Sequence, residues 1–121
     1  MKFFITLPLL ILFGCSKQNS SVQSDEFVLQ HIVLCWLKEP GNASQREQII
    51  ELTQTFNEIP SVLKARAGQV ISSDRDIVDD SFDVGIVVVV KDEKALQEYL
   101  DHPIHKKGKT EVLLPLIDKV L

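Results

Sequence analysis

Apolar runs and amphipathic stretches alternate over residues 27–121 in an order that predicts strands and helices in turn. Residues 27–37 are rich in β-branched and aromatic side chains and contain no glycine or proline, which predicts a first strand. Further strands are predicted at residues 62–71 and 82–90, with a short last strand at residues 117–121. The third of these runs is almost entirely apolar, which is typical of a strand covered on both faces.

An amphipathic helix is predicted between the first two strands. Ser44 and Glu47 have the spacing of a capping box, in which each side chain satisfies a backbone N–H at the start of a helix. Apolar side chains then recur at helical intervals and stop before Pro60, which disfavours helical geometry in the residue preceding it.

A second helix is predicted after the third strand, with Asp92 as its N-cap. Pro103 cannot continue this helix, because its ring would clash with the preceding turn, but it suits the first position of a new helix. We therefore expect the second helix to stop near Asp101. A further helical segment is predicted at residues 104–114, and Pro115 is expected to end it.

The resulting order, β-α-β-β-α-β, predicts an α+β fold with a ferredoxin-like protomer. In this arrangement the helices cover one face of a four-stranded sheet and leave the other face open. The first and third strands are apolar on both faces, however, and a small domain does not leave such a face in water. We therefore expect a homodimer in which two copies pack sheet to sheet, since symmetric dimers are the commonest oligomers.

Residues 1–14 have the pattern of a signal peptide, with a positive charge at Lys2 followed by an apolar run too short to span a membrane. The run closes on Leu12-Phe13-Gly14-Cys15, which resembles the lipobox of bacterial lipoproteins. This resemblance implies that Cys15 is the lipid attachment site. An ordinary secretory signal with an incidental cysteine is the alternative.

Residues 15–26 then form a lipidated cysteine and a tether, which we expect to be flexible because the segment is polar and rich in serine and glutamine. Ser16 stands where, in enterobacteria-like sorting, an aspartate would retain a lipoprotein at the inner membrane. We expect the protein to be lipid-anchored in a bacterial cell envelope and to face the periplasm, with the outer membrane favoured.

The charge balance bears on the partners of the domain. The formal net charge is −4 and the isoelectric point is about 5.3, whereas proteins that bind nucleic acid carry a basic face. Lys106, Lys107 and Lys109 are interpreted as a solvated helix face. If Cys15 carries lipid, Cys35 has no partner for an intrachain disulfide, and its apolar strand predicts a buried, unreactive thiol.

Residues 99–105 concentrate the side chains that hold or move protons near neutral pH. They include Tyr99, the only tyrosine, and His102 and His105, two of the three histidines. The third, His31, is a polar group on an otherwise apolar face of the first strand. His102 is expected to cap the helix after Pro103.

Two interpretations of His31 and His105 are open. They form either a buried hydrogen-bonded pair that fixes the corner to the first strand, or part of a small-molecule pocket together with Tyr99. A metal site is the weaker alternative, because Pro103 disrupts the helical register that ligands would use and no carboxylate is clearly placed to orient them. We therefore expect neither a metal nor another cofactor.

Over residues 27–121 the chain resembles the stress-responsive dimeric α/β-barrel (Dabb) family. The resemblance lies in three stretches: His31 with the apolar residues after it, Glu58-Ile59-Pro60-Ser61-Val62, and Tyr99-Leu100-Asp101-His102-Pro103-Ile104-His105. The family implies a ferredoxin-like protomer that pairs into a dimeric α+β barrel. Most members have no assigned activity. Plant members include heat-stable stress proteins and a polyketide cyclase that closes a ring by aldol chemistry without metal or organic cofactor.

In that cyclase a tyrosine and a histidine of the matching corner perform the acid–base work, which implies catalytic roles for Tyr99 and His105. The first-strand histidine helps to line the same pocket, so the resemblance implies that His31, Tyr99 and His105 bind the ligand. A further pocket histidine of the cyclase corresponds to Val84 here, which argues against the substrate of the cyclase itself.

Two classes of function remain. The domain binds or converts a small aromatic or polyketide-like molecule by cofactor-independent acid–base chemistry, or it is a non-enzymatic, stress-related structural or assembly domain. A monooxygenase role has no supporting residue pattern. A cavity touching His31, Tyr99 and His105 would favour the first class, and a filled core would favour the second.

Overall fold

The computed structural model describes residues 27–121, so the predicted signal peptide (1–14) and the lipidated cysteine with its tether (15–26) lie outside the described residues. Within residues 27–121, no helix is both long and apolar enough to cross a membrane. The elements in chain order are β1 (Leu29–Leu37), α1 (Ala43–Thr55), a 3₁₀ turn (Phe56–Glu58), β2 (Val62–Gln69), β3 (Val84–Val90), α2 (Glu93–Asp101), α3 (Pro103–Gly108), a π turn (Lys109–Leu113), α4 (Leu114–Leu116) and β4 (Ile117–Val120).

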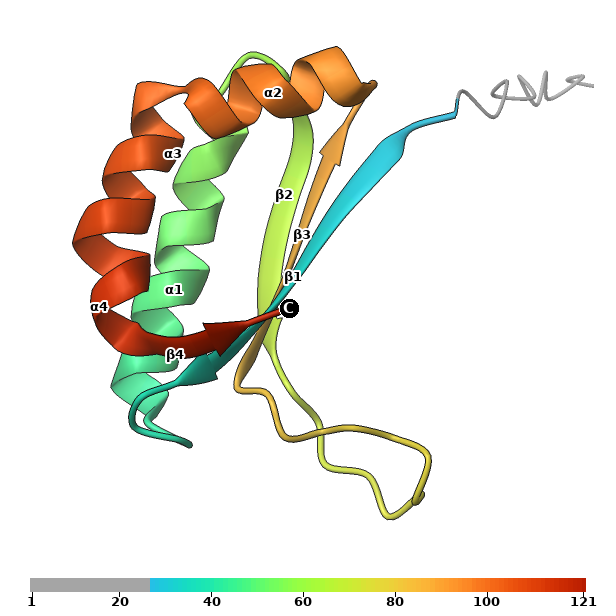
Figure 1. The fold of residues 1–121 in the computed structure, drawn as a ribbon, viewed down its shortest axis with the longest axis vertical. Helices are drawn as coiled ribbons and strands as arrows, with labels where there is room; N and C mark the ends of the chain where they lie inside the picture. The colour runs from blue at the N-terminus through green and yellow to red at the C-terminus, as the bar shows by residue number, and fades with distance from the viewer. Residues whose placement is uncertain (1–26) are drawn as a thin grey trace, which may run out of the picture.

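The strands form one antiparallel sheet in the order β2-β3-β1-β4, which confirms the predicted βαββαβ arrangement. β1 and β3 lie at its centre and pair along seven residues, from Leu29 opposite Val90 to Cys35 opposite Val84. The helices lie on one side of this sheet, with α1 alongside the segment that runs from α3 to α4 (Figure 1). The ferredoxin-like, α+β fold class is therefore confirmed.

The two faces of the sheet differ in what covers them. On the helix side, alternate residues of the central strands are fully buried: Cys35, Val84, Val88 and Val90. On the other side, Ile32 is 56% exposed, and further apolar side chains are only half-buried: Leu34, Trp36, Val87 and Val89. The central strands are apolar on both faces, as predicted, and among residues 27–121 nothing covers one of these faces.

β2 is an edge strand, and the side chain of Asn57 covers part of its free side. The Asn57 amide accepts a hydrogen bond from the Ala65 N–H at 2.8 Å and donates one to the Ala65 carbonyl at 3.0 Å. Asn57 is presented to the strand by the 3₁₀ turn that follows α1. A side-chain amide therefore occupies the position that a neighbouring strand would take.

The predicted capping box at the start of the first helix is wrong, because Asn42 rather than Ser44 is the N-cap. The Asn42 side chain accepts a hydrogen bond from the Gln45 N–H at 3.0 Å, and Ser44 lies inside the first turn. The chain turns just before, at Gly41, where φ is 79°. The buried Asp83 carboxylate holds this turn, since it accepts hydrogen bonds from the N–H groups of Gly41 and Leu37 at 2.7 and 2.9 Å.

The corner between α2 and α3 is formed as predicted. Asp92 caps α2 by accepting a hydrogen bond from the Ala95 N–H at 2.9 Å, and α2 ends at Asp101. Pro103 opens α3, and His102 Nδ1 accepts a hydrogen bond from the Ile104 N–H at 3.2 Å. His102 therefore caps the new helix, which gives it a structural role.

The predicted break at Pro115 is displaced, because helical structure continues to Leu116. The helix widens into a π turn just before the proline, and the Leu114 N–H bonds to the Lys109 carbonyl five residues earlier. In a regular α-helix the proline ring would clash with the carbonyl four residues before it, and a wider turn relieves that clash. Such π turns occur frequently at functional sites. The last strand then begins at Ile117, as predicted.

Candidate functional site

Four rings meet where the corner between α2 and α3 packs onto β1. The centroid of the Tyr99 ring lies 4.5 Å from that of His105 and 6.1 Å from that of His31. Phe56, from the end of α1, lies 5.6 Å from both Tyr99 and His105. The structure therefore brings together the three side chains for which sequence analysis predicted a site.

Tyr99 is the most deeply placed of the three. Its side chain belongs to the buried core, with an exposed fraction of 3%, and burial raises the pKa of the hydroxyl, so that it stays protonated at neutral pH. It packs against both imidazole rings, but it does not form part of the wall of the cavity described next.

A cavity of about 360 Å³ lies between the first half of β1 and the segment that runs from α3 to β4. His31 and His105 line it, and most of the remaining wall is aliphatic: Val33, Leu100, Leu113, Leu114, Ile117 and Val120. This volume falls in the lower part of the range typical of small-molecule pockets, which are mostly apolar with a few polar groups.

His105 is held in one orientation by the main chain. Its Nδ1 lies 3.0 Å from the carbonyl oxygen of Leu100. Because a carbonyl only accepts hydrogen bonds, Nδ1 must carry the proton and the other nitrogen, Nε2, is left with a free lone pair. Burial lowers the pKa of His105, and the charges of Lys109 and His31 lower it further, against the opposing effect of the Leu100 hydrogen bond. The neutral, basic form is therefore favoured.

His31 lies on the helix-facing side of β1, opposite Val88 of β3. Burial lowers the pKa of this imidazole as well, so both histidines of the cavity are uncharged at neutral pH. Two neutral imidazoles in an aliphatic wall offer hydrogen-bonding groups without a fixed charge.

The short length of β4 opens the cavity at the edge of the sheet. β4 and the residue after it pair only with residues 34–37 of β1. The Leu34 N–H and carbonyl both form hydrogen bonds with Leu121, on the β4 side of β1. The backbone groups of Ile32, two residues earlier, point to the same side, but β4 does not extend far enough to pair with them. Ile32 accordingly contributes to the cavity wall.

Lys109 is exposed, as expected for a solvated helix face, and it also lines the cavity. It follows His105 by four residues, the spacing that places two side chains on one face of a helix. The proximity of its charge contributes to the lowered pKa of His105. The spacing could have indicated Lys109, but the sequence did not show that the helix would turn this face toward β1.

Cys35 is fully buried, and burial raises the pKa of its thiol to about 11, as expected for an unreactive cysteine. Val84, at the position of the additional cyclase histidine, is also fully buried. Across residues 27–121, no three side chains of histidine, cysteine, aspartate or glutamate are grouped so that they could hold a metal ion.

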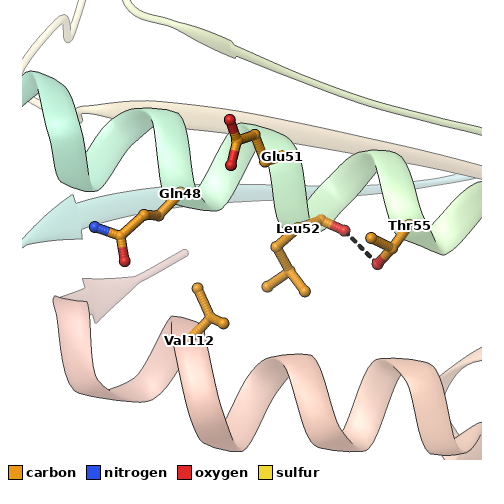
Figure 2. A pocket seen from close by; sticks show the side chains of 5 residues that line it. All are labelled: Gln48, Glu51, Leu52, Thr55 and Val112. Atoms are coloured by element: carbon orange, nitrogen blue, oxygen red, sulfur yellow. Dashed lines mark hydrogen bonds between the residues drawn. The ribbon is translucent and has the colours of Figure 1, made fainter.

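A second hollow, of about 320 Å³, lies on the outer side of the helices. Figure 2 shows it between α1 and the π turn, where Gln48, Glu51, Leu52, Thr55 and Val112 line it. The Thr55 hydroxyl donates a hydrogen bond to the Leu52 carbonyl at 2.7 Å and is therefore engaged by its own helix. This hollow contains neither a histidine nor a cysteine, so we assign the candidate site to the cavity beside His31 and His105.

Solved structures with the same fold come from bacteria and plants. A Dabb family protein with a ferredoxin-like fold from Mesorhizobium loti is 21% identical with a TM-score of 0.62, over 78% of this chain and 90% of that one. A dimeric ferredoxin-like protein of unknown function from Thermobifida fusca is 20% identical with a TM-score of 0.62, over 80% and 88% of the two chains. The hydroxynitrile lyase of Passiflora edulis is 18% identical with a TM-score of 0.67, over 79% and 89%.

These identities show a shared fold. No curated protein shows significant similarity to the chain. The sequence profile of the Stress responsive A/B Barrel Domain, Dabb, matches residues 29–121, which include the whole sheet, the helices and the cavity. The protein therefore belongs to the Dabb family of stress-responsive A/B barrel domains.

Proposed function

We propose that the cavity binds a small apolar molecule and that His105 acts on it as a general base, without a metal or organic cofactor. The observation that carries this proposal is the hydrogen bond between His105 Nδ1 and the Leu100 carbonyl. It fixes the tautomer and leaves Nε2 as a free base in a site with an aliphatic wall.

The chemistry that this base supports is the removal of a weakly acidic proton. Nε2 takes a proton from a hydroxyl group, or from a carbon next to a carbonyl, and the resulting imidazolium later returns a proton to the product. Neutral His31 serves as a hydrogen-bonding partner for the substrate oxygen. Tyr99 acts as a positioning residue, because it packs against both imidazoles and lies outside the cavity wall.

The histidines also provide the test. The chain contains three, and His102 caps α3, so its ring serves as an internal reference. We expect 4-oxo-4-phenylbutanamide, a neutral ketone of suitable size, to shift the imidazole NMR signals of His31 and His105 and to leave that of His102 in place. Mandelonitrile is a second probe, suggested by the similarity to a hydroxynitrile lyase. If neither probe moves the His31 and His105 signals, the non-enzymatic structural role is favoured instead.

We further propose that the protein is a homodimer built on the open face of the sheet. The exposed apolar residues of β1 and β3 support it, because a monomer would leave them in water. The description of similar structures as dimeric supports it as well. Two copies packed in this way would form the dimeric α+β barrel expected from the family resemblance.

Lipid anchoring through Cys15 in a bacterial envelope is also proposed, with the periplasmic side of the outer membrane as the favoured location. The support is the sequence alone: a positive start, a short apolar run and the Leu12-Phe13-Gly14-Cys15 ending. We expect Cys15→Ser to move the protein from the membrane fraction of the native host and to leave an uncleaved precursor. Cys35→Ser is the control for the loss of a thiol. Recovery of the wild-type protein in soluble form, without acyl mass, would contradict this prediction.

A further inference from the structure

We propose that the cavity is selective for small carboxylic acids with an apolar body, and that Lys109 binds their carboxylate group. This inference rests on the proposed function of the cavity beside His31 and His105, and it adds the class of ligand and the residue that selects it.

Among residues 27–121, Lys109 is the one charged side chain that lines this cavity. Both histidines have lowered pKa values and are neutral near pH 7. The rest of the wall consists of aliphatic residues. A ligand that satisfies the whole surface therefore combines an apolar body with a single negative group.

The charge of Lys109 is available to a ligand. Two lysines on the neighbouring helices have acidic partners: Lys94 lies 3.2 Å from Glu98, and Lys106 lies 3.9 Å from Asp101. For Lys109 no carboxylate lies within ion-pair distance among residues 27–121. The Lys109 side chain is exposed and reaches the solvent at the cavity mouth. It therefore attracts the carboxylate of an incoming ligand before the apolar part of that ligand is buried in the cavity.

The π turn explains why Lys109 and the aliphatic wall act together. Lys109 is its first residue and Leu113 its last, and Leu113 and the next residue, Leu114, both line the cavity. Lys109 also follows His105 by one helical turn on the same face. A ligand whose carboxylate binds the Lys109 ammonium group would therefore have the adjoining part of its apolar body near His105, the proposed base.

The size of the cavity limits the ligand. At about 30 Å³ of liquid volume for each water-sized group, a cavity of about 360 Å³ holds a molecule of about a dozen non-hydrogen atoms. A suitable probe is 4-oxo-4-phenylbutanoate, which has a carboxylate, an aromatic body and a ketone. Its amide, 4-oxo-4-phenylbutanamide, has the same number of non-hydrogen atoms and no charge, and it serves as the matched comparison.

The test measures binding of both probes to the full chain by isothermal titration calorimetry. We expect the wild-type protein to bind the carboxylate about three- to tenfold more tightly than the amide, and this preference to weaken at high salt. Lys109→Met, which keeps most of the length of the side chain and removes its charge, should remove the preference, and Lys109→Arg should retain it. Lys107→Met is the control, because Lys107 lines a separate hollow between α1 and α3, and this substitution should leave the preference unchanged.

A second readout separates this inference from the proposed function. Binding of the carboxylate should raise the pKa of His105 in an NMR titration, because the anion offsets the charge of Lys109. His31, whose charge affects the pKa of His105, and Tyr99, whose ring packs against it, are the other titratable groups nearby. The His31 signal should respond to the amide as well, since His31 lines the cavity. Equal affinities for the two probes, or a preference for the carboxylate that persists in Lys109→Met, would overturn this inference. The proposed function of the cavity would be unaffected by that result. No effect of either probe on the His31 and His105 signals would overturn the proposed function itself.

Discussion

A Val87→Lys substitution should convert the proposed dimer into monomers and raise its dissociation constant by at least about 100-fold. Val87 lies near the middle of the open sheet face, paired with Ile32 on β1 and with Arg66 on β2. A lysine there would bring an ammonium group next to the Arg66 guanidinium at the centre of the interface. By symmetry each dimer would bury two such uncompensated charges.

Light scattering at micromolar concentration measures this effect, together with circular dichroism to verify that the variant is folded. Ile77→Lys is the matched control, because Ile77 is 93% exposed in the loop between β2 and β3. It makes the same chemical change away from the open face and should leave the mass unchanged. A wild-type monomer, or a Val87→Lys protein that stays dimeric, would show that the sheet face is not the interface.

Replacing His105 by alanine should slow proton removal by about 100- to 10,000-fold, the range typical of a general base. The assay follows exchange of deuterium from D₂O into the carbon next to the ketone of 4-oxo-4-phenylbutanoate. In the proposed reaction Nε2 takes a proton, the ketone becomes an enolate, and the imidazolium, which exchanges with solvent, returns a deuteron. Each step conserves charge and needs no oxidant or reductant.

The pH dependence of this exchange follows from the lowered pKa of His105. The reactive form is the neutral imidazole, so the rate should be level near pH 7 and should fall as the pH drops through a value below the ordinary histidine pKa of about 6.5. His102→Ala would disturb the α3 cap, so His102→Asn, which retains capping ability, is the preferred control and should keep the exchange rate. Unchanged exchange in His105→Ala would exclude His105 as the base.

Much of the fold could be predicted because local rules act strongly in this chain. Pro103 fixes the corner between α2 and α3, whatever the surroundings, since a proline both ends one helix and suits the start of the next. The alternation on β1 and the apolar run of β3 place their side chains on the correct faces. The grouping of Tyr99, His105 and His31 followed from the family resemblance and from their positions along these elements.

Other features depended on interactions that the sequence does not display. Asn42 replaced Ser44 as the cap because the turn at Gly41, held by the distant Asp83, determines where the helix begins. Lys109 lies at the cavity because the helical face that it shares with His105 turns toward β1, an orientation set by tertiary packing. The placement of Tyr99 behind the cavity wall depends on the packing of Phe56, a contact between elements far apart in sequence.

The amide of Asn57 has a consequence for how large an assembly can become. A sheet with a bare edge can accept strands from further copies without limit, which leads to filaments and aggregates. At Ala65 the N–H and the carbonyl of β2 are already engaged by Asn57, so the edge offers an incoming chain no free pair of hydrogen-bonding groups there. Addition of further strands at this point of the β2 edge is therefore disfavoured, even where the protein is concentrated on a surface.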